Sequence, residues 1–430
     1  MTITPNRTQA PAFHSVKDVH LLQAAEHKLS NGIPIFVLNA GTQEVVKIEW
    51  QFTAGICRQP QPLVATAVND MLDEGIPGRS AEELAEELDY YGAFIESETT
   101  HDNASFTLYT LNRHLPAVLP LVRAMLFEAS FPAAEFDVYI SNRRQKFVVD
   151  AAKVSNMARR GFSELLFGTQ HPYGAKAELS DFDKLTREQL VDFHRTHYTP
   201  EGCTIIVAGM VTDAVTNEIS KVFGSLASGT QPAIHAALPA PVTHSGRIHT
   251  LEKADAIQSA IRTGRLLFNK THADYHGMQV LNTVFGGYFG SRLMANIRED
   301  KGYTYGIGSG LVSLREAGYF VISTEVGVNV TNATLHEIRT ELDKLRQEEI
   351  PADELELVRN YMTGVFLRST DGPFALADRL KGLLGYNLSY DYYSRFLQTV
   401  QSISAAELQQ LAQKYLNPDD LTELVAGMRK

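Results

Sequence analysis

Alternation of apolar and polar positions predicts strands in four stretches of the chain: 46–55, 104–110, 256–264 and 319–328. In the first of these, Val46, Ile48, Trp50 and Phe52 are apolar at every second position. Successive side chains of a strand point to opposite faces, so these four share one face. The alternation therefore predicts sheets with one strongly apolar face.

Helical spacing of apolar residues follows two of these strands, over 63–72 and 275–285. Another helix is predicted to begin at Ser80, because Ser80 and Glu83 have the spacing of a capping box. Leu84 and Leu88 follow one helical turn apart, which gives this helix an apolar side.

The two halves of the chain end with the same pattern of a helix, a turn marked by proline and an apolar strand. The first half closes with Tyr198, Pro200 and Val207-Ala208-Gly209-Met210. The second half closes with Tyr415, Pro418 and Val425-Ala426-Gly427-Met428. The strand and helix that open each half, over 46–72 and 256–285, also correspond. Matches at both ends, in the same order, suggest an internal duplication.

A stretch rich in proline and small residues, 227–245, is predicted to be a linker between the halves. It divides the chain into a domain over 1–226 and a homologous domain over 246–430. Each half reads as two strands, two helices, two strands, long helices and a last strand. This order predicts an α+β fold of two sandwich domains. We expect each domain to have a mixed, mostly antiparallel sheet with helices packed on one face.

Composition narrows the possible partners. The 430 residues carry a formal net charge of −11, which argues against a nucleic-acid partner. No apolar run approaches the ~20 residues that a membrane span needs, so no membrane contact is expected. The first residues lack the apolar core of a signal peptide, which favours the cytoplasm, or the periplasm if a leader has been removed. With only Cys57 and Cys203, no disulfide framework or thiolate metal cluster is expected.

Four stretches in order resemble the inverzincin metallopeptidases, the family of pitrilysin, insulin-degrading enzyme and mitochondrial processing peptidase. They are Met71-Leu72 with Gly75 and 79–85, Leu165 to Gly168 with His171-Pro172-Tyr173-Gly174, the closure over 198–210, and Gly286-Gly287 through Arg298 to Tyr305. The resemblance covers nearly the whole chain. It implies two homologous α+β domains in one subunit and pairing of subunits around a closed peptide chamber.

The resemblance also implies a zinc motif, H-x-x-E-H, on the helix just before Met71. Two His one turn apart can bind one ion, and the Glu beside them can take a proton from the metal-bound water. In this chain the three positions are Thr66, Asn69 and Asp70. The family's third ligand, a Glu in a later helix, is matched most nearly by Asp150. We therefore expect no zinc site and no catalytic residue in this chain alone.

In the family, an Arg and a Tyr seven residues apart hold the substrate and polarise the carbonyl of the bond that is cleaved. Arg298 and Tyr305 match this pair, and the nearby glycine loop at Gly286 and Gly287 is expected to lie close to the substrate. Such donors stabilise the charge that develops on the carbonyl oxygen. The alternative is that Arg298 only ends a charged helix.

Four other histidines are candidate metal ligands by residue type. His194 and His197 are three apart in a predicted helix, and the favoured interpretation is a solvated helix face. His101 and His171 have no neighbouring ligand in sequence, and structural roles are expected for both.

These features favour a non-catalytic subunit of a heterodimeric zinc peptidase. A zinc-bearing paralogous subunit would supply H-x-x-E-H and the metal, and the complex would cleave unfolded peptides. The alternative is a purely structural subunit with no role in proteolysis. A hydrolase with another site is a third possibility, but the chain has no G-x-S-x-G motif, and neither Cys57 nor Cys203 has a nearby His.

Overall fold

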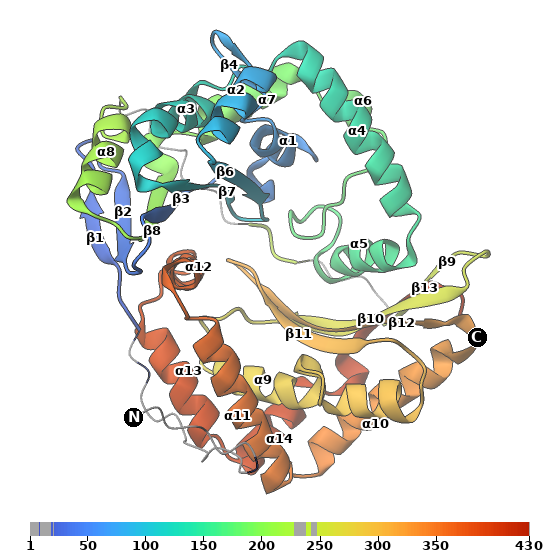
Figure 1. Cartoon of the computed structure of the whole chain (residues 1–430). Helices are drawn as coiled ribbons and strands as arrows, with labels where there is room; N and C mark the ends of the chain where they lie inside the picture. The colour runs from blue at the N-terminus through green and yellow to red at the C-terminus, as the bar shows by residue number, and fades with distance from the viewer. Residues whose placement is uncertain (1–7, 9–18, 20, 228–237, 242–246, 430) are drawn as a thin grey trace.

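The computed structural model describes Thr8, Val19 and residues 21–227, 238–241 and 247–429. Each half of the chain forms one large sheet, with most of its helices on the side facing away from the other half (Figure 1). This confirms the predicted α+β class. The predicted linker over 227–245 lies largely outside the described residues, so the boundary between 1–226 and 246–430 stays a prediction.

The first sheet has six strands in the order β1-β2-β8-β3-β7-β6. The strands are β1 Ala25–Lys28, β2 Pro34–Asn39, β3 Val45–Phe52, β6 Phe94–Thr99, β7 Ala104–Leu111 and β8 Cys203–Gly209. Only β2 and β8 run parallel, while the other four pairings are antiparallel. The short strands β4 (Gly75–Ile76) and β5 (Arg79–Ser80) form a separate pair.

The second sheet has five strands in the order β11-β12-β10-β13-β9. They are β9 Ile248–Glu252, β10 Gln258–Leu267, β11 Ile307–Ser313, β12 Gly318–Gly327 and β13 Thr422–Gly427. Again only one pairing, between β13 and β9, is parallel. Both sheets are therefore mixed and mostly antiparallel, as predicted.

The strand order supports the duplication. In each half, the long strand that opens the motif (β3 or β10) lies between the closing strand (β8 or β13) and the second strand of a hairpin (β7 or β12). The closing strand also pairs in parallel with β2 in the first half and with β9 in the second. Five strands thus follow one topology in both halves, and β1 is an addition to the first.

The closing motifs fold as the sequence predicted. Helix α7 (Arg187–His197) and helix α14 (Ala405–Tyr415) both begin with capping boxes, which satisfy the free amides of the first turn. A 3-10 turn that begins at Pro200 or Pro418 then leads into β8 or β13. The predicted capping box at Ser80 is also present, at the start of α2 (Ala81–Tyr90).

Helices cover the apolar face of each sheet. In the first half they are α1 Val64–Asp70, α2, α3 Leu115–Glu128, α7 and α8 Asp213–Phe223, while α4 Ala133–Ala151, with the short α6 Asp181–Lys184 beside it, extends from them towards the second half. In the second half they are α9 Tyr275–Asn282, α10 Thr331–Gln347, α11 Ala352–Arg368, α13 Asp391–Ser402 and α14. No single described helix is long and apolar enough to cross a membrane, although Asn112–Glu128 and Ala133–Ala151 together pass that test with a 79° bend between them.

The two halves each contribute one helix to the opposite sheet. Helix α5 (Val154–Phe167) follows α4 in the first half but packs on β10 and β13. Helix α12 (Pro373–Leu384) occupies the same place after α11 and packs on β8 and β2. Leu376 and Leu380 of α12, for example, belong to the same buried apolar cluster as Ile206 of β8. The exchange covers part of the inner face of both sheets and joins the halves (Figure 1).

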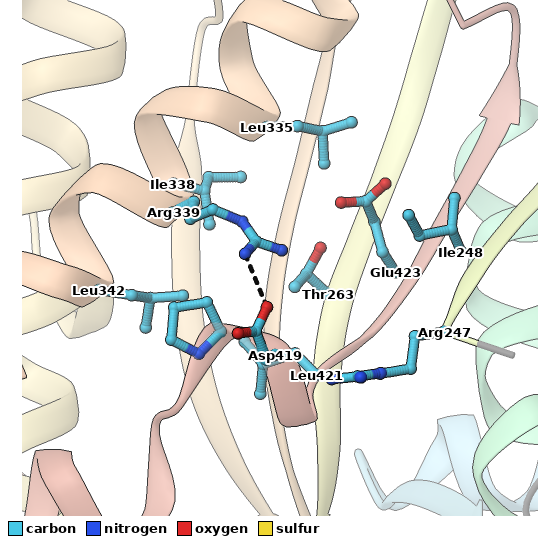
Figure 2. A pocket seen from close by; sticks show the side chains of 11 residues that line it. Arg247, Ile248, Thr263, Leu335, Ile338, Arg339, Leu342, Asp419, Leu421 and Glu423 are labelled. Atoms are coloured by element: carbon cyan, nitrogen blue, oxygen red, sulfur yellow. Dashed lines mark hydrogen bonds and ion pairs between the residues drawn. The ribbon is translucent and has the colours of Figure 1, made fainter.

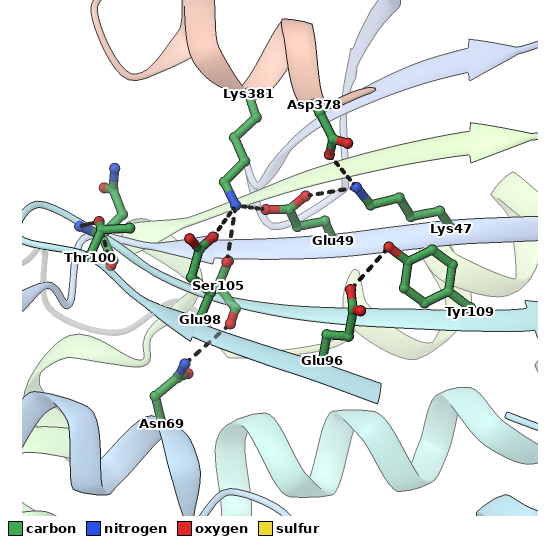
Figure 3. Close-up of polar contacts among 11 residues, drawn as sticks. Lys47, Glu49, Asn69, Glu96, Glu98, Thr100, Ser105, Tyr109, Asp378 and Lys381 are labelled. Atoms are coloured by element: carbon green, nitrogen blue, oxygen red, sulfur yellow. Dashed lines mark hydrogen bonds and ion pairs between the residues drawn. The ribbon is translucent and has the colours of Figure 1, made fainter. Parts of the chain in front are cut away.

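A charged network strengthens the contact of α12 with the first sheet (Figure 3). Glu49 on β3 is only 1% exposed, and its carboxylate lies 2.7 Å from Nζ of Lys381 and 3.6 Å from Nζ of Lys47. Lys381 also pairs with Glu98 on β6, and Lys47 with Asp378 on α12. Both faces of β3 are therefore buried, with apolar residues on one side and ion pairs on the other.

Candidate functional site

The matched zinc-motif positions lie beside a hollow of about 280 Å3 between α1, α4 and α5. Thr66 on α1 and Asp150 on α4 both line it. Arg143 and Phe147 of α4 line it as well, because they precede Asp150 by two turns and one turn on the same helix face. The structure thus brings together two of the four positions that the sequence singled out.

Asn69 is a structural residue. It is 1% exposed, its Nδ2 donates to the Ser105 carbonyl oxygen at 3.2 Å, and its Oδ1 accepts from the Tyr198 hydroxyl at 3.0 Å. These bonds tie α1 to β7 and to the end of α7. Since both ends of the amide are engaged and point into protein, Asn69 has no free group to offer a metal or a water.

Asp70 is held by two side chains of α4. Its carboxylate accepts a hydrogen bond from the Tyr139 hydroxyl at 2.8 Å and forms an ion pair with Arg143. Burial, followed by the charge of Asp70, raises the pKa of Tyr139, so this phenol remains a proton donor. In place of a metal, a hydrogen-bonded ion pair joins α1 to α4.

The residues present do not suit the zinc ion that the fold family implies. Asp70 already neutralises Arg143, and a dication placed there would be repelled by that guanidinium. Asp150 pairs with Lys153 at 2.8 Å. Within the described part of the chain, no group of three His, Cys, Asp or Glu side chains is arranged to hold a metal. No reaction step is therefore assigned to a metal held by these residues.

Arg298 lies on a widened helical segment. Helix α9 continues into a π-helical turn at Thr283–Gly287, and a second π-helix spans Met294–Asp300. Such segments are rare and are often found at functional sites. The Arg298 guanidinium lies 4.6 Å from the ring centre of Phe289, a residue that is 61% exposed. This cation–π contact holds the side chain while it stays accessible.

Tyr305 projects from an anchored turn. Gly302, at φ +67°, reverses the chain after the helix. The Thr304 hydroxyl then donates to the carbonyl oxygen of Glu325 at 2.8 Å and accepts from the amide of Gly306 at 3.1 Å. Tyr305 itself is 94% exposed, and no hydrogen bond of its hydroxyl is present among the described residues. The turn is thus fixed while its aromatic side chain is free.

Tyr305 also borders a second hollow, of about 460 Å3, between β10, β12 and α5. Ser155 and Ala158 of α5 line this hollow, while Asn156 and Arg159 of the same helix line the hollow at Thr66. Helix α5 therefore contributes to both, and Arg298 lines neither.

The glycine loop divides into two environments. A side chain at Gly286 would bring its Cβ within 2.5 Å of the Ser309 hydroxyl, so this glycine allows close packing against β11. Gly287 is exposed and lines a different hollow, beside Tyr361. Contact of either glycine with substrate stays a prediction.

One interpretation of the histidines is wrong. His194 was expected on a solvated helix face, but it is 7% exposed and stacks on Tyr198, with Nε2 2.9 Å from the Leu126 carbonyl oxygen. Burial lowers its pKa to about 4, so it is neutral. The apolar side of α7 extends further than its sequence indicated. His171 has the expected structural role, since its Nδ1 accepts from the Tyr173 amide at 3.0 Å.

A third hollow, of about 230 Å3, lies on the helix-covered side of the second sheet (Figure 2). Thr263 lies at its floor and corresponds to Trp50 of the first half. Each of them pairs with a residue of the closing strand, and that residue lies three positions before the alanine of Ala426–Gly427 or of Ala208–Gly209. In the first half, Phe223 of α8 packs on Trp50, with ring centres 5.0 Å apart. In the second half, the same place is a hollow bordered by the ion pair of Arg339 and Asp419.

The sequence reasoning missed the basic side chains around Thr66. Arg143, Lys146, Arg159 and Arg160 all line that hollow. Arg143, Lys146 and Asp150 recur at helical spacing, so the face of α4 could have been recognised from sequence. The contribution of α5 could not, because its place on the opposite sheet depends on the whole fold.

Comparison with known proteins agrees with this geometry. The family described as "Peptidase M16 inactive domain" matches residues 184–362. An uncharacterized zinc protease of Bacillus subtilis is 24% identical over 407 residues, which is 92% of this chain and 96% of that protein. Residues 184–362 thus match the M16 peptidase family, and the similarity to the Bacillus subtilis protein extends over 92% of the chain. This confirms the resemblance seen in the motifs.

Solved structures show the same fold. The crystal structure of a peptidase M16 inactive domain from Pseudomonas fluorescens superposes with a TM-score of 0.86 at 22% identity, over 95% of this chain and 99% of that one. A protease from Helicobacter pylori gives 0.84 at 17% identity, over 95% and 100%. The M16 fold therefore extends over nearly the whole chain, while its zinc-motif positions carry Thr66, Asn69 and Asp70.

Proposed function

We propose that this M16 chain is the non-catalytic subunit of a heterodimeric zinc peptidase that acts on unfolded peptides in the cytoplasm. A paralogous partner would carry H-x-x-E-H and the zinc. The observation that carries the proposal is the contrast between the two candidate sites. Asp70 is closed off by Arg143 and Tyr139, whereas Tyr305 is 94% exposed on a fixed turn.

In this proposal the partner's zinc supplies an activated water, and this chain supplies binding and orientation. The Arg298 guanidinium and the Tyr305 hydroxyl donate hydrogen bonds to the peptide carbonyl oxygen. Both hydrogen bonds strengthen as negative charge develops there, which lowers the barrier to attack. The anchored turn supports this role, because a donor held in place needs no reorganisation during the reaction.

The purified chain is expected to hold no stoichiometric zinc and to cleave no peptide. Addition of an M16 paralogue with an intact H-x-x-E-H motif should produce chelator-sensitive cleavage of an unfolded peptide. Turnover by the chain, the paralogue and their mixture tests this directly. Chelator-sensitive cleavage by the chain alone, or one tightly bound zinc per chain after dialysis, would sink the proposal.

A purely structural subunit is the second candidate. The closed Asp70 site suits it equally well. The exposed Phe289 and Tyr305 and the half-buried Arg298 favour the first candidate, since a structural role gives no reason to hold an accessible guanidinium and phenol on fixed supports.

A further inference from the structure

The hollow at Thr66 is strongly cationic. Arg143, Lys146, Arg159 and Arg160 line it, and Asp150 is the one carboxylate among its lining residues. The chain as a whole has a net charge of −11. A local excess of positive charge in so acidic a protein needs an explanation, because like charges held together repel each other.

Most of these cations lack a carboxylate partner. Among the described residues, the side chain of Lys146 forms no ion pair or hydrogen bond, and the guanidinium of Arg159 bonds only to the Asn156 side-chain oxygen, at 3.3 Å. Arg160 donates to the Ala177 carbonyl oxygen and lies over the Phe147 ring. Asp150 is already neutralised by Lys153, which lies outside the hollow. The positive charge is therefore not balanced locally.

Helix α5 adds to the positive potential. It begins at Val154, so the free amides of its first turn lie beside Asn156, which lines the hollow. The Asn156 side chain donates to the Asp150 carbonyl oxygen at 3.0 Å, which fixes this end of the helix against α4. On the far side of α5, Arg262 of β10 also has no carboxylate partner in the described chain. Cationic groups thus continue past α5 to the second sheet.

We propose that the hollow left by the lost zinc site binds the carboxylate of a peptide, either its C-terminus or an Asp or Glu side chain. The inference rests on the proposed function, because it takes a peptide as the ligand. Guanidinium and ammonium groups form charge-assisted hydrogen bonds with carboxylates, and the planar Arg fork can hold both oxygens. A volume of about 280 Å3 suits one such group with its adjoining residue. The site would position acidic peptides rather than cleave them.

Binding is measured on the purified chain alone, by fluorescence anisotropy of four labelled peptides of one neutral sequence. They combine a free or amidated C-terminus with an internal Glu or Gln. The amidated peptide with Gln should bind most weakly. Charge-assisted hydrogen bonds of this kind correspond to about tenfold in affinity. The double variant Lys146→Gln/Arg159→Gln should remove that difference, whereas Arg195→Gln, on an exposed ion pair of α7, should retain it.

The pattern among the peptides identifies the source of the carboxylate. If peptides with a free C-terminus bind more tightly whether or not they contain Glu, the hollow binds the C-terminal carboxylate. If Glu increases the affinity of amidated peptides, the hollow binds a side-chain carboxylate. Equal binding of all four peptides overturns the inference. So does a double variant that keeps the full preference while its circular-dichroism spectrum is unchanged. Because no partner is present, this result is independent of whether the reconstituted complex cleaves peptides.

Discussion

At the scale of single residues, two of the three zinc-motif positions have structural partners. Asn69 bridges Ser105 and Tyr198, and Asp70 is bound by Tyr139 and Arg143. The sequence shows that neither the two His nor the Glu of the zinc motif stands at these positions, because residue type alone decides that. It could not predict the replacement bonds, since Asp70 and Arg143 meet only after α1 and α4 have packed.

The Asp70 contacts should contribute measurably to stability. Asp70→Asn removes the charge that pairs with Arg143 and weakens the bond from Tyr139. Both partners are partly exposed, so the expected loss is about 1 kcal/mol in the free energy of unfolding. Urea denaturation measures it. Asp192→Asn, which breaks the exposed pair with Arg195, should change the value by less than about 0.5 kcal/mol. Equal losses in the two variants would contradict this account of Asp70.

His194 should make the protein less stable in acid. Burial lowers its pKa to about 4 in the folded chain, against the usual 6.5. Between these values the unfolded chain binds the proton and the folded chain does not, so stability falls as pH drops from about 6.5 towards 4. The contribution is up to about 3 kcal/mol. His194→Gln should therefore lose less stability than the wild type between about pH 7.5 and pH 4.5. Parallel losses in the two proteins would show that His194 does not contribute.

At the scale of elements, the exchanged helices determine how the halves are joined. The alternating strands, the three capping boxes and the two closing motifs were predictable, because they depend on local spacing. The crossing of α5 and α12 to opposite sheets was not, since an amphipathic helix does not specify which apolar surface it covers. The buried ion pairs under α12 were not predictable either, because they form only when α12 covers the first sheet. In the sequence, Lys47 and Glu49 occupy the polar positions of an alternating strand, which are usually exposed.

Lys381 should be essential to this joint. Lys381→Met leaves Glu49 buried with only the more distant Lys47, at 3.6 Å. Removing one partner of a buried ion pair typically costs about 3–5 kcal/mol. The same change at the exposed Lys221, which pairs with Glu218, should cost less than about 1 kcal/mol. Chemical denaturation of both variants compares them. A loss at Lys381 no larger than that at Lys221 would mean that the network does not hold α12 in place.

At the scale of the whole molecule, one M16 fold carries two contrasting candidate sites. At the positions matched to the zinc motif, the first half has an ion pair and a cationic hollow. The second half keeps Arg298 and Tyr305 accessible on rigid supports. This division suits a subunit that binds and orients a peptide for a partner that cleaves it.

One measurement tests that claim most directly. It is the turnover of the complex with a zinc-bearing paralogue when this chain carries Tyr305→Phe or Arg298→Lys. Loss of one oxyanion donor costs roughly 10²–10³ in turnover, so both variants should fall by about that factor. Assembly and zinc content should stay unchanged, because neither side chain supports the fold. Tyr90→Phe, at a tyrosine that is 82% exposed in the first half, is the matched control and should keep full activity. Full turnover by both the Tyr305→Phe and the Arg298→Lys complexes would contradict the account and leave this chain a structural subunit.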